Sequence, residues 1–336
     1  GAENPCTILV IEPSPAERNL LWVGTDDGRL HITRDGGGTW TEVGTNIKGL
    51  PKGSWIPQIK ASPDNPGEAL LVANDYRRFN YTPYAYRTRD FGRSWERIVD
   101  ADDVASYTLS IIQDPENPNL LFLGTDDGLY YSMDGASSWS KWDHGYPTVS
   151  TKDLAIHPRE HDLVIGTFGR AAWVLDDIRP LRAIAGNPAV LEKDIALFPT
   201  PTAYQAAYQQ PTGSRFGGDA IFNGENRRRG AMITYYLKSG KKEMDAEKKG
   251  AGNSGANEKE SAPGEDNEGE DNEKMTRDSV VFKFYDGERL IRTLKYKTPD
   301  SAGLHRIYWG LDEAGADRPS RSIRKRNREP GGPDVL

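Results

Sequence analysis

Pairs of neighbouring carboxylates are the side chains of this sequence best suited to acid–base chemistry. Their members are Asp26 and Asp27, Asp126 and Asp127, and Asp176 and Asp177. Hydrolysis of a glycosidic bond needs two carboxyl groups about 5–10 Å apart, one protonated and one acting as base or nucleophile. We therefore take Asp26, Asp126 and Asp176 as candidate catalytic residues. The alternative is structural, because Asp-Asp-Gly is a favourable β-turn, and its recurrence at 24–28 and 124–128 favours that interpretation.

A second group combines arginine and tyrosine within the segment 74–88, NDYRRFNYTPYAYRT. Clustered arginines can grip a carboxylate, as a sialidase site requires, and loops on a rigid scaffold often carry function. We expect this segment to be an unusually long connection between two strands. The candidate ligand-binding residues are Tyr76, Arg77, Arg78 and Tyr81, with Arg170 in the matching turn of a later repeat. The alternative is that these side chains only cover the rim of the fold.

Other chemistries find no support in the sequence. The five histidines are dispersed and the single cysteine, Cys6, has no CxxC partner, so we expect no metal site. No nucleophile elbow, Walker loop or dinucleotide-binding glycine motif follows a strand-like run, and we expect no cofactor. A net charge of −7 argues against a nucleic-acid partner, and the sequence contains no apolar run long enough for a transmembrane segment.

The elements that position these residues form a repeat in the first half of the chain. Four segments each predict a strand, a proline-containing turn and a second apolar strand. The second strands read LLWVGT (20–25), ALLVAN (69–74), LLFLGT (120–125) and DLVIGT (162–167). A third strand follows, as in 30–33, 84–88 and 129–132. The repeat predicts a fold built from similar antiparallel units.

After three of these third strands the sequence carries the pattern Ser/Thr-x-Asp-x-Gly-x-Ser/Thr-Trp, at 33–40, 88–95 and 132–139. The pattern predicts a hairpin tip in which the aspartate accepts backbone N–H groups, the glycine supplies positive φ and the tryptophan packs on the hairpin. Its key residues are Asp35, Gly37, Trp40, Asp90, Gly92, Trp95, Asp134 and Trp139, with Ala136 in place of the third glycine. A spacing of about 45–55 residues matches one four-stranded propeller blade.

These motifs resemble the Asp-box (BNR) β-propellers, and residues 7–185 resemble the bacterial sortilin/VPS10-like exported proteins often described as glycosyl hydrolase BNR-repeat proteins. The stretch GTFGRAAWVLDDIRPL (166–181) is similar to the last blade of that family, with Phe168 where the family generally has histidine. The resemblance implies structural roles for Pro83 and Tyr84 and an extracellular, cell-surface or periplasmic location. It implies no single activity, because the same box occurs in enzymes and in non-catalytic proteins.

The second half differs in composition. We expect a linker at 186–230 and strands at 231–238, 279–296 and 305–311, with Asp286-Gly287 as a hairpin turn. This arrangement resembles the immunoglobulin-like β-sandwich that follows the propeller in those bacterial proteins, and we assign it to 231–336, truncated at its end.

Two charged segments interrupt or follow these strands. Residues 239–278 are nearly devoid of large apolar side chains, so we expect a disordered acidic loop. The alternative, a calcium site at 264–274, lacks the ligand spacing of an EF-hand. The basic tail at 320–332 could contact nucleic acid, but we expect it to lie on an acidic surface of its own chain or of a partner.

Together these observations predict an all-β chain: four Asp-box propeller blades over 1–185, forming part of a ring, then the linker and the β-sandwich. Because an open ring exposes strand edges, we expect the rest of the polypeptide or a partner protein to complete it. We expect a non-catalytic exported binding or assembly protein whose propeller loops engage a protein, peptide or glycan. The alternatives are a BNR-type glycoside hydrolase, sialidase- or xyloglucanase-like, acting through acidic residues of the channel, and a structural component of a surface layer.

Overall fold

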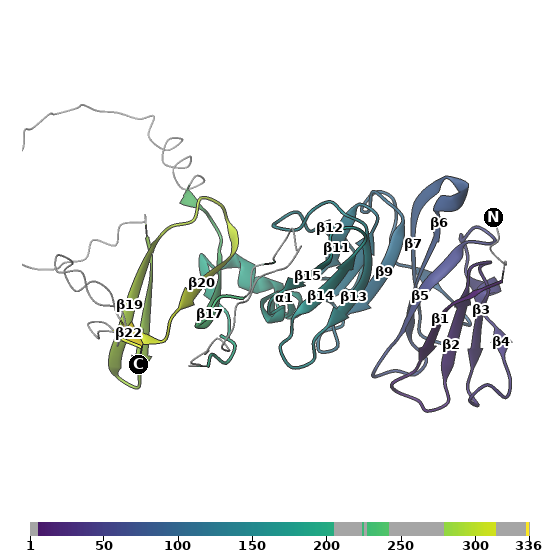
Figure 1. Ribbon diagram of the computed structural model, residues 1–336, viewed down its shortest axis with the longest axis horizontal. Helices are drawn as coiled ribbons and strands as arrows, with labels where there is room; N and C mark the ends of the chain where they lie inside the picture. The colour runs from purple at the N-terminus through teal and green to yellow at the C-terminus, as the bar shows by residue number, and fades with distance from the viewer. Residues whose placement is uncertain (1–5, 205–223, 225–226, 242–278, 314–333, 336) are drawn as a thin grey trace, which may run out of the picture. The chain divides into compact units, whose positions relative to one another are not determined.

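The computed structural model describes residues 6–204, 224, 227–241, 279–313 and 334–335 (Figure 1). Strands dominate, and α1 (Arg179–Gly186) is the one α-helix in these ranges, so the expected all-β class is confirmed. The chain divides into two compact units, 1–188 and 189–336. The acidic segment 239–278, apart from its first three residues, and the basic tail lie outside the described residues. Within the described ranges, no helix is both long and apolar enough to cross a bilayer.

Four antiparallel sheets follow one another in the first unit, and we call them blades 1 to 4. Blade 1 contains β1 (Ile8–Pro13), β2 (Leu21–Thr25), β3 (Leu30–Thr33) and β4 (Thr41–Glu42). Blade 2 contains β5 (Trp55–Ala61), β6 (Ala69–Asp75), β7 (Asn80–Thr88) and β8 (Glu96–Arg97). Blade 3 contains β9 (Thr108–Gln113), β10 (Leu121–Thr125), β11 (Gly128–Ser132) and β12 (Ser140–Lys141). Blade 4 contains β13 (Thr151–Ile156), β14 (Leu163–Thr167) and β15 (Ala172–Leu175).

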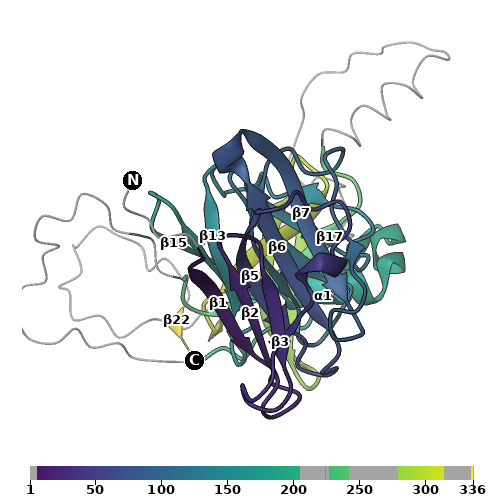
Figure 2. The ribbon, with the colours of Figure 1, turned by 90° about the vertical axis from the view of Figure 1, so that its right-hand side faces the viewer.

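Each blade is a meander in which every strand pairs with the next along the chain. Figure 2 looks onto blade 1, where β1, β2 and β3 run side by side. The first strands of successive blades also lie together, since β1 contacts β5, β5 contacts β9 and β9 contacts β13. Meander sheets whose first strands are neighbours in this way form a β-propeller arc. The completion of the ring and the sortilin/VPS10-like assignment stay predictions.

The apolar core lies between the blades, and this explains the continuous apolar runs of the second strands. In β6, Leu71 faces blade 1 while Leu70 and Val72 face blade 3. In β10, Leu121 packs towards blade 2 and Phe122 towards blade 4. Successive side chains of a strand point to opposite faces, so a strand covered on both faces is apolar at every position instead of alternating.

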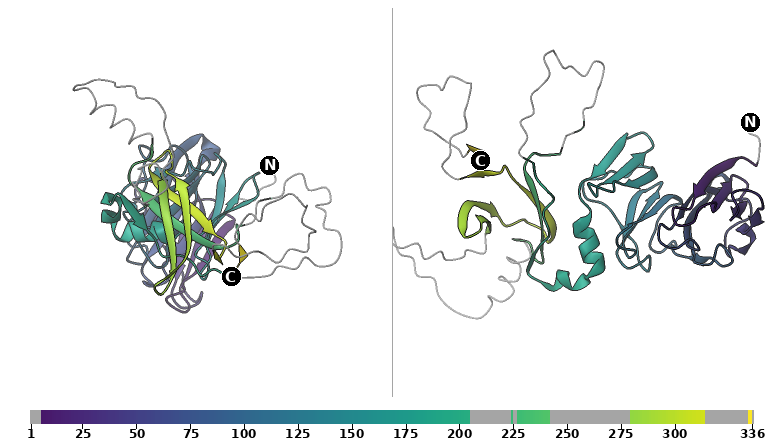
Figure 3. Two further views of the ribbon diagram at one scale, coloured as in Figure 1. Left: turned by 90° about the vertical axis from the view of Figure 1, so that its left-hand side faces the viewer. Right: turned by 90° about the horizontal axis from the view of Figure 1, so that it is seen from below.

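Blade 4 departs from the expected repeat because α1 follows its third strand in place of a fourth strand (Figure 3, right). The helix buries Leu181, Ile184 and Ala185, and Leu181 and Ala185 belong to the core between blades 3 and 4. We did not predict this helix. Its signals were present in the sequence, namely Pro180 in the first turn and apolar residues at helical spacing.

Three hairpin tips contain the Asp-box pattern, and each is closed by the same local hydrogen bonds. In the first, the Thr33 hydroxyl donates to Asp35 (2.8 Å), and the backbone N–H and the hydroxyl of Thr39 donate to the same carboxylate at 2.8 and 2.7 Å. The second and third tips repeat these contacts around Asp90 and Asp134. The φ angle is positive at Gly37, Gly92 and also Ala136, where a side chain is strained.

The box tryptophans of blades 2 and 3 pack on the preceding blade and not only on their own hairpin. Trp139 of blade 3 donates from Nε1 to the Ile98 carbonyl of blade 2 at 2.8 Å. Trp95 of blade 2 meets Trp22 of blade 1 edge-on, with ring centroids 6.1 Å apart. Trp40 of blade 1 is 45% exposed. Trp95 and Trp139 therefore each connect their blade to the blade before it.

We predict that the first Asp box makes stability depend on acid pH. Hydrogen bonds from the backbone and hydroxyl of Thr39, then from Thr33, lower the pKa of Asp35 to about 2 from 3.8. A carboxylate with a lowered pKa stabilises the fold above its unfolded pKa and loses that effect as pH falls through its folded pKa. In thermal unfolding, Asp35→Asn should melt below the unsubstituted protein at pH 6, and the gap should close between about pH 4 and pH 2.

The control for this prediction is Asp64→Asn, since the Asp64 side chain is in an exposed turn outside any Asp box. It should leave the melting temperature unchanged across the same pH range. A gap between Asp35→Asn and the unsubstituted protein that persists unchanged at pH 2 would contradict the prediction.

The second unit contains a sheet of β16 (Ile195–Leu197), β17 (Ala231–Leu237) and β20 (Gly303–Trp309), and a hairpin of β18 (Ser279–Asp286) and β19 (Arg289–Lys297). The short β21 (Asp312–Glu313) pairs with β22 (Asp334–Val335). The hairpin turns at Gly287, whose φ is +60°. The range 186–230 that we expected to be only a linker thus holds a strand, because β16 covers one edge of β17. The immunoglobulin-like topology stays a prediction.

Candidate functional site

The three candidate catalytic aspartates lie in or beside turns. Asp26 accepts the backbone N–H of Thr7 at 2.8 Å, and Asp126 donates its own N–H to the Tyr107 carbonyl at 3.2 Å. Both residues follow the second strand of a blade, whereas Asp176 follows a third strand and therefore lies at the opposite end of its sheet. Hydrolysis by these three carboxylates acting together finds no support in this placement.

The second aspartate of each pair forms an ion pair with a nearby cationic side chain. Asp27 forms an ion pair with Arg29 at 3.4 Å, and Asp127 forms one with Lys141 at 2.6 Å. Asp177 is buried with a positive φ and pairs with Arg179 at 2.6 Å. These contacts engage all three carboxylates with cationic side chains of their own blade or of the adjoining helix. They agree with the structural alternative for these residues.

A cavity of about 560 Å³ lies over blades 2, 3 and 4. It is formed by strands β5, β6, β9 and β13 and by the short 3₁₀ helix η2 (Tyr76–Arg78). Its lining residues are Trp55, Pro57, Gln58, Lys60, Asn74, Tyr76, Arg77, Leu109, Lys152 and Asp153. A smaller cavity of about 140 Å³ shares Trp55, Asn74 and Arg77 with it and adds Gly53, Asp75 and Arg78.

The segment 74–88 is therefore part of a cavity, but not as the long connection we expected. Strands β6 and β7 extend through most of it, which leaves η2 and Phe79 as the turn. The buried carboxylate of Asp75 holds this turn by pairing with Arg78 and accepting a hydrogen bond from Asn80 at 3.3 Å. Arg78 is thus engaged within its own turn and lines the smaller cavity, whereas Tyr76 and Arg77 line the larger one.

The remaining candidates lie outside the lining. Tyr81 belongs to an aromatic group beside the cavity, in which Tyr76 stacks on Tyr107 at 4.6 Å and Tyr81 lies 6.1 Å from the same ring. Burial, together with a hydrogen bond to Asp126, raises the pKa of Tyr107. Arg170 lies in the turn after β14, where its carbonyl accepts the Trp173 indole N–H at 3.0 Å. The structure does not bring Arg170 to the cavity.

One buried side chain joins the three blades at the floor of the cavity. The Gln58 amide donates to Asp153 Oδ1 at 3.1 Å, and its oxygen accepts the Ile111 N–H at 2.7 Å. Asp153 Oδ1 also accepts the Leu154 N–H at 2.9 Å. Gln58 therefore fixes the position of the one carboxylate among the cavity-lining residues.

Blade 2 departs from the repeat at Asn74. The equivalent residues of the other blades are Thr25, Thr125 and Thr167, which occupy the same place in the strand register. Each threonine hydroxyl bonds within the turn that follows it. Asn74 donates instead to the Thr108 carbonyl of blade 3 at 3.3 Å, and its buried Oδ1 accepts no hydrogen bond from the described residues.

Three cationic residues, Lys60, Arg77 and Lys152, line the same cavity as Asn74. The Arg77 guanidinium lies over the Trp55 ring and 4.8 Å from the centre of the Tyr76 ring. Lys152 lies 5.7 Å from the centre of the ring of the exposed Phe168. Burial raises the pKa of the Glu12 carboxyl, and the nearby charge of Lys60 offsets part of this rise. None of the three cations forms an ion pair with a carboxylate of the described ranges.

Sequence reasoning missed most of the lining. Gln58, Lys60, Lys152 and Asp153 lie on the first strands β5 and β13, and Trp55 begins β5. The sequence did contain an indication of these site residues, because they are polar residues in strands that are mostly apolar in the other repeats. That signal identifies polar strand positions, but it does not show which blades share a cavity.

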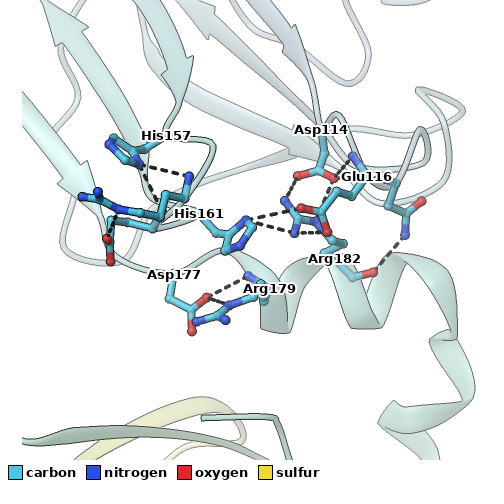
Figure 4. A network of polar contacts seen from close by, with 10 residues as sticks. Asp114, Glu116, His157, His161, Asp177, Arg179 and Arg182 are labelled. Atoms are coloured by element: carbon cyan, nitrogen blue, oxygen red, sulfur yellow. Dashed lines mark hydrogen bonds and ion pairs between the residues drawn. The ribbon is translucent and has the colours of Figure 1, made fainter. Parts of the chain in front are cut away.

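A network of charged side chains lies apart from the cavity, between blade 3 and α1 (Figure 4). Arg182 binds Asp114 through two hydrogen bonds of 2.8 and 2.6 Å and pairs with Glu116 at 2.7 Å. His161 lies 3.3 Å from Arg182 and 3.4 Å from Glu116. Asp114 is buried and also accepts two backbone N–H groups of its own turn. This network attaches the helix to the blade.

Comparison with known proteins gives distant similarity. No protein-family model matches the chain. It is 23% identical over 213 residues to an oligoxyloglucan-reducing end-specific xyloglucanase of Emericella nidulans, covering 59% of this chain and 26% of that protein. A probable enzyme of the same name from Neosartorya fischeri is 21% identical over 235 residues, covering 65% and 26%. The chain thus spans about a quarter of the length of these curated relatives.

Among solved structures, the Niastella koreensis GH74 enzyme aligns with a TM-score of 0.42 and 16% identity, covering 53% of this chain and 29% of that one. The sequence similarity is thus to one xyloglucanase and one probable xyloglucanase, each over about a quarter of its length.

Proposed function

We propose that this chain is the glycan-binding part of an exported, glycoside-hydrolase-like propeller protein and that the cavity over blades 2 to 4 holds the glycan. The cavity composition carries the proposal. Aromatic rings stand beside two amides and one carboxylate, and a sugar presents apolar C–H faces and hydroxyl groups to such side chains. The hydrogen bonds of Gln58 hold Asp153 of blade 4 and the backbone of blade 3 in place, which supports a preorganised site.

Binding is proposed ahead of hydrolysis because a glycosidase needs two carboxyl groups. Asp153 is the one carboxylate lining the cavity among the described residues. Hydrolysis is the second candidate, and the similarity to xyloglucanases favours it. In that case a second carboxyl group would have to join Asp153 from elsewhere in the protein. The exported location rests on the resemblance to Asp-box proteins.

Calorimetric titration of the whole chain with a neutral xyloglucan oligosaccharide tests the proposal. We predict that Trp55→Ala weakens binding at least tenfold, equivalent to about 1.4 kcal/mol, because the ring lines both cavities. Trp40→Ala is the matched control, since this exposed tryptophan lies outside both cavities, and it should leave affinity unchanged.

Release of reducing ends, measured in the same mixtures, separates binding from hydrolysis. Turnover abolished by Asp153→Asn, with binding retained, would favour the hydrolase. A folded protein that binds neither neutral nor acidic oligosaccharides would overturn the proposal and favour a protein or peptide ligand instead.

A further inference from the structure

The buried acceptor of Asn74 points to a ligand group that donates a hydrogen bond. The residue is 2% exposed and lines both cavities, and its Oδ1 accepts nothing from the described residues. A buried polar atom left unpaired costs about 1–3 kcal/mol, so such an atom at a cavity wall calls for a partner. The threonines at the equivalent positions have their partners inside the turn, so the unpaired acceptor is specific to blade 2.

The charge of the lining points to an anionic group on the same ligand. The larger cavity is lined by three cationic residues, Lys60, Arg77 and Lys152, and by one carboxylate, Asp153, whose Oδ1 is already engaged. The smaller cavity adds Asp75, which is paired with Arg78. Arg77 is held by the faces of aromatic rings, which leaves the N–H edge of its guanidinium for a bidentate partner. A carboxylate is the planar group that fits this edge.

We infer that the cavity binds an acidic sugar, with its carboxylate on Arg77 and the neighbouring lysines and a hydroxyl donated to Asn74 Oδ1. This inference rests on the proposed function and names its ligand class. Uronic acid residues carry both groups on one ring. A peptide carboxylate offers the anion as well, but the hydroxyl donor and the aromatic surroundings favour the sugar.

The test is calorimetric titration of the whole chain at low salt with a galacturonic acid trisaccharide and with its methyl ester. The acid should bind at least roughly tenfold more tightly than the ester, as expected for hydrogen bonds to a charged group. Arg77→Gln should abolish this preference while the ester still binds. Asn74→Thr, which installs the residue of the other blades, should weaken both ligands by a roughly equal factor, since it removes the hydroxyl partner.

Arg89→Gln is the matched control, because this exposed arginine pairs with Glu96 and lines neither cavity. It should preserve the preference for the acid. Equal affinities for acid and ester, with Trp55-dependent binding of neutral oligosaccharides, would overturn the inference and leave the proposed function standing. Binding of a polyglutamate peptide in preference to every sugar would overturn both in favour of an acidic peptide, and binding of no ligand would also overturn both.

Discussion

Replacing Arg182 with methionine is expected to lower the free energy of unfolding by about 3 kcal/mol. Methionine has an uncharged side chain similar in length to the aliphatic part of arginine. The substitution therefore leaves the fully buried carboxylate of Asp114 without its guanidinium partner. Breaking a buried ion pair from one side typically costs about 3–5 kcal/mol, because a desolvated charge remains. We expect the lower end of that range since two backbone N–H groups still bind Asp114.

Denaturant unfolding followed by tryptophan fluorescence measures this effect in the first unit, because Trp309 is the one tryptophan beyond residue 188. The control is Arg89→Met, which breaks an exposed ion pair with Glu96 and should cost less than about 1 kcal/mol. In the double variant Asp114→Asn with Arg182→Met, much of the loss should be recovered, because no buried charge is left. A loss below about 1 kcal/mol for Arg182→Met alone would show that the network does not attach α1 to blade 3.

The second large effect is expected from Gly124→Ala, at about 3 kcal/mol. A Cβ atom at this position of β10 would collide with Ser110 Oγ and lie 2.6 Å from the backbone oxygen of Thr151 in blade 4. Overpacking a closed interior typically costs about 1–3 kcal/mol, and here a backbone atom of the next blade would have to move. Gly124 does not have a positive φ, so the cost is steric and not conformational.

The repeat supplies its own control for this substitution. Gly166 occupies the equivalent position in blade 4, where a Cβ would meet nothing nearer than 3.6 Å, so Gly166→Ala should change stability by less than about 0.5 kcal/mol. Gly24→Ala should fall between the two, since it meets the ends of the Ile56 and Val10 side chains. Blade 2 already carries an alanine, Ala73, at this place. Equal losses for Gly124→Ala and Gly166→Ala would contradict the inter-blade explanation.

The strands of the blades could be predicted well from the sequence, because their determinants are local. The motifs at 20–25, 69–74, 120–125 and 162–167 coincide with β2, β6, β10 and β14 within one residue or two. The Asp-box turns form through hydrogen bonds that span four residues or fewer. The helix α1 was missed because the repeat favoured a fourth strand, although Pro180 and the apolar spacing indicated a helix.

The candidate site was predicted only in part, because some of its residues are close together in the chain and others are far apart. Tyr76 and Arg77 were found because arginine and tyrosine cluster along the chain, and both line the cavity. Arg170 was included by analogy between turns, yet the corresponding turn of blade 4 lies outside the cavity. Gln58 and Asp153 were missed because they are 95 residues apart, and only the packing of β5 against β9 and of β9 against β13 makes them partners.

The repeat, the strand order within each blade and the Asp-box turns follow from local features of the chain, namely continuous apolar runs and hydrogen bonds between near neighbours. Only the folded chain shows which residues of different blades come together. This arrangement brings Asn74 of β6, whose Oδ1 accepts no hydrogen bond from the described residues, into the lining of the cavity that Arg77, Lys152 and Asp153 also line. It depends on apolar packing between sheets, which brings residues from distant parts of the chain together and leaves no fixed spacing in the sequence.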